Sequence, residues 1–243
     1  MDLDCFIIHL ERAHERAAQV AATQDALPLR CRVMPAVDGQ AMTEAEARAH
    51  VPGLLPPRYP FALRPSEVAT FHSHRACWRR IVDEGLPAAL ILEDDLEIDT
   101  QRFLPALELA CGAVRDGDFV RFPIKPREEA GEVIAKNGTA RLGRHDAVAL
   151  GMVAQLVTQG AARKLLDATE RFDRPVDTFL QMTWVHRVRI LTAWPTGIEE
   201  VSARLGGSLI QRKEGLWPKL RREVLRPIYR RRIAALARKH PNV

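Results

Sequence analysis

The stretch that decides the fold is Ala88-Ala89-Leu90-Ile91-Leu92-Glu93-Asp94-Asp95, an apolar run that changes abruptly into three acids. Five consecutive apolar residues are typical of a parallel strand that is buried on both faces. The carboxyl ends of such strands form the edge at which open α/β sheets bind their ligands. We therefore expect the acidic triplet, defined as Glu93, Asp94 and Asp95, to lie at a ligand-binding edge of a sheet.

A helix is expected directly before this strand. Ser66 is a candidate N-cap, apolar residues recur at helical spacing from Val68 to Val82, and Gly85 and Pro87 mark the end. Further strands are expected at residues 5–8, 29–34, 118–122 and 188–193, with one or two more within 147–157. Further helices are expected at 11–22, after a Thr43–Glu46 capping box, and at 103–111, 160–169 and 177–187. This alternation predicts the α/β class, with a sheet covered by helices.

Length and charge divide the chain into a globular part and a tail. The 243 residues suit one large domain or one domain with a tail, and the net charge of +5 is unevenly placed. Residues 217–243 hold nine Lys or Arg and one acid, a net +8, which leaves −3 for the rest. We therefore expect a domain over 1–210 and a basic amphipathic tail over 211–243, with Pro218 and Pro227 punctuating two short helices.

Two segments between these elements carry no chemistry in this interpretation. Five prolines between Pro52 and Pro65 predict a surface loop. Asn137-Gly138-Thr139 matches an N-glycosylation acceptor, which has no weight in a chain expected to stay in the cytoplasm. That expectation rests on the lack of an apolar run long enough to span a membrane and of a basic secretory leader.

The acidic triplet points to a metal ion. Adjacent carboxylates repel one another unless a cation neutralises them, and oxygen ligands favour Mg²⁺ or Mn²⁺. Such ions take one or two protein carboxylates and complete their shell with water and substrate phosphate. The alternative is that the triplet only opens a polar loop or caps a helix starting near Thr100. Neither GxGxxG nor GxxxxGK[ST] occurs, which argues against Rossmann dehydrogenases and P-loop NTPases.

Several motifs together resemble glycosyltransferase family 25, the lipooligosaccharide glycosyltransferases, which have collagen galactosyltransferases as relatives. The central block is Ser73-His74, the run from Trp78 to Pro87, and the strand with its acidic triplet. Weaker matches follow in family order: Ile7 to Arg12 with Arg16, Ala36 to Gly39, Gly160 to Leu166, Pro175 to Asp177, and Gly206 to Ser208. The resemblance covers roughly residues 5–210, and it departs from the family at His9, at Ser66 and within 151–155.

The resemblance implies a GT-A-like domain with a mixed, mostly parallel nucleotide-binding sheet. It also implies metal-dependent, inverting transfer of a hexose, galactose or glucose, from a UDP-sugar to a saccharide acceptor, in lipopolysaccharide, lipooligosaccharide or other cell-surface glycan synthesis. Glu93 and Asp95 would then hold Mn²⁺ or Mg²⁺ with Asp94 beside them, and Asp38 and His74 would lie near the donor. Inversion needs one general base on the acceptor side, for which Asp177 is the candidate.

Each of these roles has a plainer alternative. Arg12 and Arg16, four apart on the first helix, suit diphosphate oxygens, but Glu11 and Glu15 are ready partners on an exposed face. Asp177 follows Pro175 and fits an ordinary helix cap, His74 fits a structural core residue, and Asp38 fits a turn before Gly39.

Rival readings remain for the tail and for the whole protein. The basic tail could bind an anionic membrane surface at the inner face of the membrane, or form a helix that packs on the domain. The scarcity of aromatic residues in the tail argues against nucleic-acid binding. Rival functions are another metal-dependent nucleotidyl or phosphoryl transferase, and a non-enzymatic membrane-bound or nucleic-acid-binding adaptor.

Overall fold

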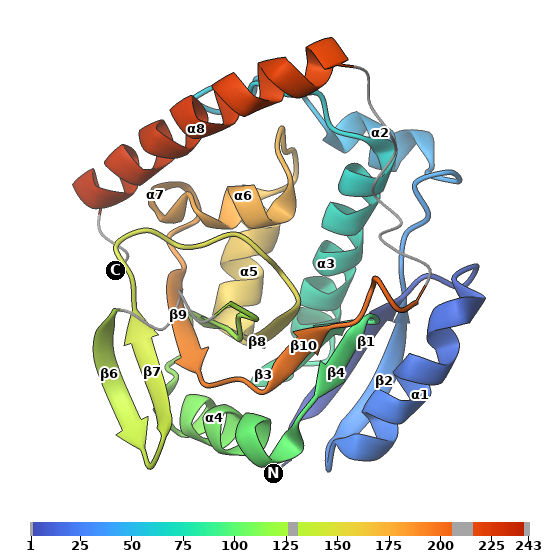
Figure 1. The fold of residues 1–243 in the computed structure, drawn as a ribbon, viewed down its shortest axis with the longest axis vertical. Coiled ribbons are helices and arrows are strands. Elements are labelled where there is room, and N and C mark those ends of the chain that lie inside the picture. The colour runs from blue at the N-terminus through green and yellow to red at the C-terminus, as the bar shows by residue number, and fades with distance from the viewer. Residues whose placement is uncertain (1, 126–130, 206–215, 241–243) are drawn as a thin grey trace.

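The computed structural model describes residues 2–125, 131–205 and 216–240, without the side chains of 216–222. Its centre is an eight-stranded sheet with the order β2-β1-β3-β8-β5-β9-β7-β6 (Figure 1). The strands are β1 (Asp4–His9), β2 (Arg30–Pro35), β3 (Ala88–Glu93), β5 (Asp118–Arg121), β6 (Glu132–Asn137), β7 (Ala140–Arg144), β8 (Ala154–Thr158) and β9 (Arg189–Trp194). A separate antiparallel pair joins β4 (Leu96–Ile98) to β10 (Ile198–Glu200).

The sheet is mixed. Strands β2, β1 and β3 are mutually parallel, as are β5 and β9, whereas β8 is antiparallel to both of its neighbours and β7 to both of its own. Six of the eight strands therefore point the same way, with β8 and β7 reversed. This arrangement confirms the expected α/β class with a mostly parallel sheet.

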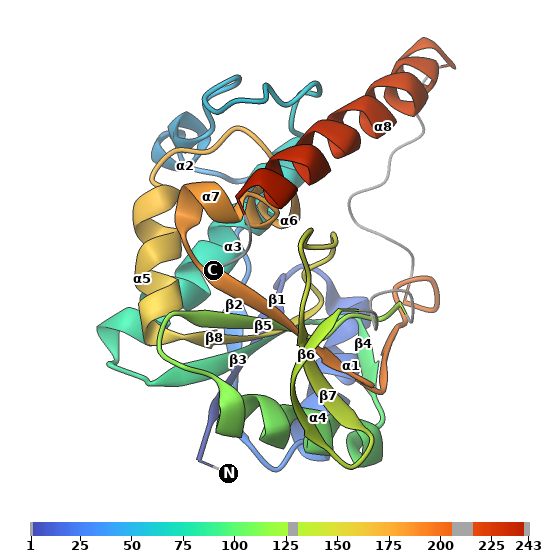
Figure 2. The same cartoon turned by 90° about the vertical axis from the view of Figure 1, so that its left-hand side faces the viewer.

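Helices cover both faces of the sheet (Figure 2). Alternate residues of β3 point to opposite sides, so Ala89 and Ile91 pack with one set of helices and Leu90 and Leu92 with the other. This double burial is the reason for the continuous apolar run. The first face is covered by α3 (Pro65–Asp83), α5 (Gln159–Ala168) and α6 (Val176–Leu180), and the second by α1 (Ala17–Ala26) and α4 (Thr100–Ala113).

Local signals placed most helix ends correctly. Thr43 and Glu46 form the expected capping box at α2 (Glu44–Ala49), and Thr158 accepts from the Ala161 N–H at the start of α5. The N-cap of α3 is Arg64 rather than Ser66, because the Arg64 N–H donates to Glu67 Oε2 at 2.7 Å and Pro65 occupies the first turn. The proline-rich stretch forms no regular element, as expected.

Other expectations were wrong. The helix expected over residues 11–22 is a 3₁₀ turn, η1 (His14–Arg16), followed by α1, which continues to Ala26. The helix expected over 177–187 is two short helices, α6 and α7 (Thr183–His186). Of the one or two strands expected within 147–157, one is present as β8 from Ala154, whereas residues 147–153 form no strand. The structure also contains a hairpin that was not expected, formed by β6 and β7, which turns at Gly138 with a φ of 56°.

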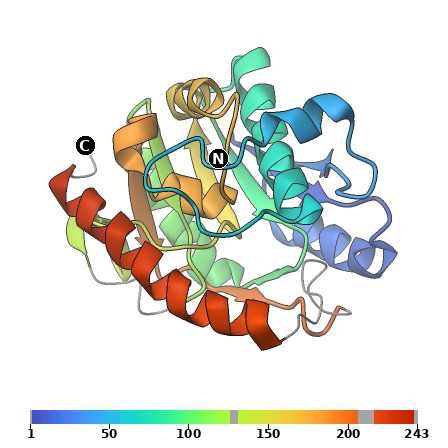
Figure 3. The same cartoon turned by 90° about the horizontal axis from the view of Figure 1, so that it is seen from above.

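The tail contains one long helix, α8 (Leu216–Lys239), with Pro227 inside it, rather than two short ones. Seen from above, α8 runs along one side of the domain (Figure 3). Tyr229 and Ile233 pack on Met182, and the Tyr229 hydroxyl accepts from Nη1 of the buried Arg174 at 2.6 Å. Among the described helices, none combines the length and apolarity that a membrane crossing requires. The expected boundary at residue 210 and the Gly206–Ser208 motif lie outside the described residues.

Candidate active site

The acidic triplet connects β3 to β4 at the carboxyl end of β3, as expected. Glu93 is the last residue of the strand, and its N–H donates to the Val153 carbonyl at 3.0 Å. The Asp95 carbonyl accepts from the Val201 N–H at 2.8 Å, which ties the triplet to the segment after β10. The triplet does not cap α4, because Asp99 is the N-cap of that helix.

Asp94 and Asp95 are buried against a shared arginine. Asp94 accepts from Arg16 Nη1 at 2.5 Å and contacts His9 Nδ1 at 2.8 Å. The same Nη1 lies 3.1 Å from Asp95 Oδ2. Arg16 itself is buried at the end of η1, so its charge is committed to these two carboxylates. His9, one of the departures from the family pattern, therefore supports the triplet directly.

Burial and neighbouring carboxylates disfavour the ionised forms of Glu93 and Asp95 in the absence of a cation. Loss of hydration, followed by repulsion from Asp94, Glu200 and Asp177, raises the pKa of Glu93 to about 8. Loss of hydration and the neighbouring Glu93 raise the pKa of Asp95 to about 6, although Arg16 opposes the shift. The Glu93 side chain is still 32% exposed, so a ligand in solution reaches it. A site of this kind favours a bound cation.

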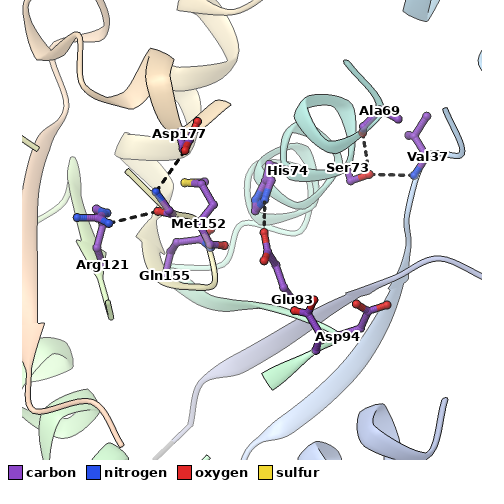
Figure 4. Close-up of polar contacts among 12 residues, drawn as sticks. Val37, Ala69, Ser73, His74, Glu93, Asp94, Arg121, Met152, Gln155 and Asp177 are labelled. Atoms are coloured by element: carbon purple, nitrogen blue, oxygen red, sulfur yellow. Dashed lines mark hydrogen bonds and ion pairs between the residues drawn. The ribbon is translucent and has the colours of Figure 1, made fainter. Parts of the chain in front are cut away.

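His74 lies over Glu93 from the buried face of α3 (Figure 4). Its Nε2 is 3.8 Å from Glu93 Oε1, and neither ring nitrogen has a hydrogen-bond partner within the described part of the chain. Burial lowers the pKa of His74 to about 4, so the ring is neutral near pH 7. The structure thus brings His74 close to Glu93 of the acidic triplet.

Asp177 reaches the same side of the sheet from the first turn of α6 (Figure 4). Pro175 is the N-cap of α6, so the interpretation of Asp177 as a simple cap is wrong. Its Oδ2 accepts from the Gly151 N–H at 3.3 Å, and its Oδ1 accepts from the Thr178 hydroxyl at 3.2 Å. Asp177 is also one of the charges that raise the pKa of Glu93. The half-buried carboxylate therefore acts electrostatically on the triplet.

The structure separates Arg12 from Arg16. Arg12 lies in the turn before η1, and its Nε and Nη2 donate to Asp38 at 2.6 and 3.1 Å. This pair is partly exposed, and the guanidinium lowers the pKa of Asp38. The acids that the two arginines bind, Asp38 and Asp94, are distant in sequence. Arg12 and Asp38 are thus joined to each other rather than to the triplet.

The donor set fits a cation that draws part of its shell from a substrate. Over the described ranges, no three His, Cys, Asp or Glu side chains lie together in a way that could hold a metal ion. Both oxygens of Asp94 are engaged by His9 and Arg16, whereas Asp95 meets Arg16 through Oδ2, so Glu93 and the second oxygen of Asp95 are the candidate donors. One or two carboxylates are what Mg²⁺ or Mn²⁺ usually takes when phosphate oxygens and water complete the shell. Glu93 and Asp95 could therefore supply part of a cation's shell but not all of it.

Glu200 belongs to the site but was not anticipated. It comes from β10, which pairs with β4 so that Glu200 is opposite Leu96, the residue after the triplet. Its charge raises the pKa of both Glu93 and Asp95. The sequence contains no local signal for this role, because the approach depends on pairing between strands about a hundred residues apart.

The protein has a mixed α/β sheet with a carboxylate cluster at the carboxyl end of a central strand. These features place it among the α/β proteins that bind a ligand at that edge of the sheet. Comparison with known proteins specifies the family: residues 2–180 match the model of "Glycosyltransferase family 25 (LPS biosynthesis protein)". This chain therefore belongs to glycosyltransferase family 25, which supports a function in glycosyl transfer.

Curated relatives match over different lengths. Procollagen galactosyltransferase 1 of Danio rerio is 32% identical over 40% of this chain and 17% of its own length. A glycosyltransferase 25 family member of Anopheles gambiae is 26% identical over 78% of this chain and 34% of its own. The probable inactive glycosyltransferase 25 family member 3 of Bos taurus is 28% identical over 83% of this chain and 35% of its own length. The chain thus spans about a third or less of these relatives.

Proposed function

We propose that this protein is a metal-dependent, inverting glycosyltransferase that moves a hexose, galactose or glucose, from a UDP-sugar to a saccharide acceptor. The observation that carries the proposal is the acidic triplet at the end of β3, where burial and neighbouring carboxylates raise the pKa of Glu93 and Asp95, in a chain of family 25. The family description supports lipopolysaccharide, lipooligosaccharide or another cell-surface glycan as the acceptor.

Glu93 and Asp95 would hold Mn²⁺ or Mg²⁺, which supplies Lewis-acid stabilisation of the charge that develops on the leaving diphosphate. Arg16 and His9 orient Asp94 and so keep the triplet in one arrangement. The Arg12–Asp38 pair offers a guanidinium for diphosphate oxygens and a carboxylate for the uridine, on the exposed side of the same strand ends.

Asp177 would act as the general base. It accepts the proton of the acceptor hydroxyl while that oxygen attacks the anomeric carbon on the face opposite the diphosphate, and the configuration inverts. Thr178 and Gly151 occupy one position on each of its oxygens, which leaves acceptor capacity on both. His74, neutral and without a hydrogen-bond partner in the described residues, is available to bind the donor sugar or phosphate.

Titration calorimetry with UDP, with and without Mn²⁺, tests this function. Metal-enhanced UDP binding supports the transferase. Tight triphosphate binding would favour a nucleotidyl transferase instead, and an absence of nucleotide binding would favour the adaptor.

Asp95→Asn separates the metal role from the fold. We expect about a thousandfold loss of metal-dependent donor cleavage, because a stabilisation of several kcal/mol is removed from the leaving group. Glu97→Gln, a change to an exposed carboxylate on the neighbouring β4, is the matched control and should remain active. A fully active Asp95→Asn enzyme with an unchanged melting temperature would exclude the metal role.

Asp177→Asn tests the general base. The variant should keep UDP-sugar binding and lose transfer; lost binding would assign Asp177 another role.

We also propose that the outer face of α8 attaches the protein to an anionic membrane surface at the cytoplasmic side. One face of the helix packs on the domain through Tyr229 and Ile233. The opposite side leaves Val224 and Ile228 55% and 43% exposed. The same helix carries exposed basic residues: Arg226, Arg230, Arg231, Arg232, Arg238 and Lys239. Each basic residue near such a surface contributes about 1 kcal/mol, so several act together.

Co-sedimentation with vesicles tests the attachment. We expect binding to phosphatidylglycerol vesicles, little to phosphatidylcholine vesicles, and loss of binding in high salt. Arg230→Gln combined with Arg231→Gln should weaken it, whereas Arg163→Gln on the exposed side of α5 should not. Equal binding to both vesicle types, or preferential binding to nucleic acid, would contradict the proposal.

A further inference from the structure

Side chains from the sheet hold the loop over residues 147–153 in place. Arg121 Nη2 donates to the Leu150 carbonyl at 2.9 Å and to the Gly151 carbonyl at 3.3 Å. The next carbonyl, that of Met152, accepts from Gln155 Nε2. Two side chains thus donate hydrogen bonds to three successive carbonyl groups. In a strand, backbone N–H groups of the neighbouring strand would be the donors. This explains why an apolar segment lies beside the sheet without joining it.

The loop is also held from the helical side. Gln181, which follows α6, donates through Nε2 to the Val148 carbonyl at 2.5 Å. The loop therefore bridges the sheet and the segment that carries Asp177. Its position is set by long-range hydrogen bonds at both ends.

Arg121 and Gln155 lie on the same face of the sheet as the catalytic candidates. Arg121 on β5 is in register with Gln155 on β8, and Gln155 is in register with Ile91, two residues before Glu93. Because side chains alternate along a strand, Ile91 and Glu93 share a face, and Gln155 lies beside them. Both Arg121 and Gln155 are buried. Figure 4 shows them on one side of the site with Asp177 above.

The loop aims one N–H at Asp177. With its carbonyl turned toward Arg121, Gly151 adopts a φ of 110°, and its N–H donates to Asp177 Oδ2 at 3.3 Å. A positive φ of this size is easily reached only by glycine. The hydrogen bond to Asp177 thus depends on a backbone conformation that Arg121 helps to hold.

We propose that Arg121 is a positioning residue for Asp177 and acts through the Gly151 turn. This inference rests on the proposed role of Asp177 as the general base. A base must lie within hydrogen-bond reach of the hydroxyl whose proton it accepts, and a misplacement of about 1 Å costs as much as a hundredfold in rate. By fixing Gly151, Arg121 sets the orientation of the carboxylate without touching the substrate. Loss of the turn should therefore lower kcat while leaving the KM for the donor unchanged.

A pair of glycine variants tests the turn. Gly151→Ala adds a Cβ that meets nothing closer than Arg121 Nη2 at 3.9 Å, so its effect comes from the strained φ. Gly138→Ala in the β6–β7 hairpin is the control, because it also has a positive φ and a Cβ there meets nothing within 4 Å. We expect kcat to fall about tenfold or more in Gly151→Ala and to stay near the parent value in Gly138→Ala. Equal losses in both variants would overturn the inference.

Arg121→Lys tests the anchor itself. Lysine keeps the charge but lacks the planar fork, so it cannot hold both carbonyls in the same geometry. We expect about a tenfold loss in kcat, an unchanged donor KM and unchanged UDP binding by calorimetry, which also reports that the fold is intact. Combined with Asp177→Asn, the change should cause no further loss, because both act at one step.

The outcomes distinguish the inference from the function on which it rests. An Arg121→Lys enzyme as fast as the parent, or losses that multiply in the double variant, would overturn the positioning role while leaving Asp177 as the base. A fully active Asp177→Asn enzyme would overturn the base assignment first, and the positioning role with it.

Discussion

Two buried histidines, His74 on α3 and His186 on α7, have nearly the same exposure and pKa but very different hydrogen bonding. They are 1% and 2% exposed, and burial lowers the pKa of each to about 4. His186 Nε2 lies 3.1 Å from the Leu180 carbonyl, and its Nδ1 accepts from the Val188 N–H at 3.1 Å. His74 has neither kind of contact among the described residues. Burial and pKa alone thus do not separate a structural histidine from one available to a ligand; hydrogen-bond satisfaction does.

The largest effect is expected at His186. His186→Leu leaves the Leu180 carbonyl and the Val188 N–H without partners in the core, so we expect a loss of about 3 kcal/mol in the free energy of unfolding. Urea denaturation measures it. UDP binding at low temperature should be unchanged, since His186 lies outside the acidic cluster. A loss below about 1 kcal/mol would show that the two hydrogen bonds contribute little.

The same histidine gives a pH dependence with a defined sign. Burial, with a smaller contribution from the charge of Lys164, lowers the pKa of His186 from near 6.5 in the unfolded chain to about 4 in the folded state. The unfolded state therefore binds more protons at this residue, so its contribution to stability, about 3 kcal/mol, is lost as the pH falls from about 6.5 toward 4. Urea denaturation across this range should show a shallower pH dependence in His186→Leu than in the parent. Parallel curves would contradict the prediction.

The smallest effect on stability is expected at His74. His74→Leu removes two ring nitrogens that lack partners and keeps a similar volume, so the free energy of unfolding should change by less than about 1 kcal/mol. Transfer from the UDP-sugar should nevertheless fall, because the polar group facing Glu93 is lost. Denaturation and steady-state kinetics on one preparation decide the matter. A stability loss as large as that of His186→Leu, with full activity, would make His74 a structural residue.

Local signals predicted some elements well and missed others for identifiable reasons. The strand before the acidic triplet was correct, because burial on both faces leaves an uninterrupted apolar run. Within 147–157, where one or two strands are expected, only the part from Ala154 is a strand; in the preceding loop, side chains of Arg121 and Gln155 bind backbone carbonyl groups. The β6–β7 hairpin turns at Asn137-Gly138, a dipeptide typical of two-residue hairpin turns, although no strand is expected there.

The sequence by itself determined the α/β class, the caps of α2 and α5, and the acidic triplet at the end of β3, because these depend on periodicity and on contacts between residues close along the chain. Only the tertiary structure decided which charges meet: Arg16 with Asp94, Arg12 with Asp38, and Glu200 beside the triplet. Those partners are separated by 26 to about 110 residues, and their approach is set by strand order and by the β4–β10 pairing. Long-range geometry of this kind leaves no periodic trace in the sequence.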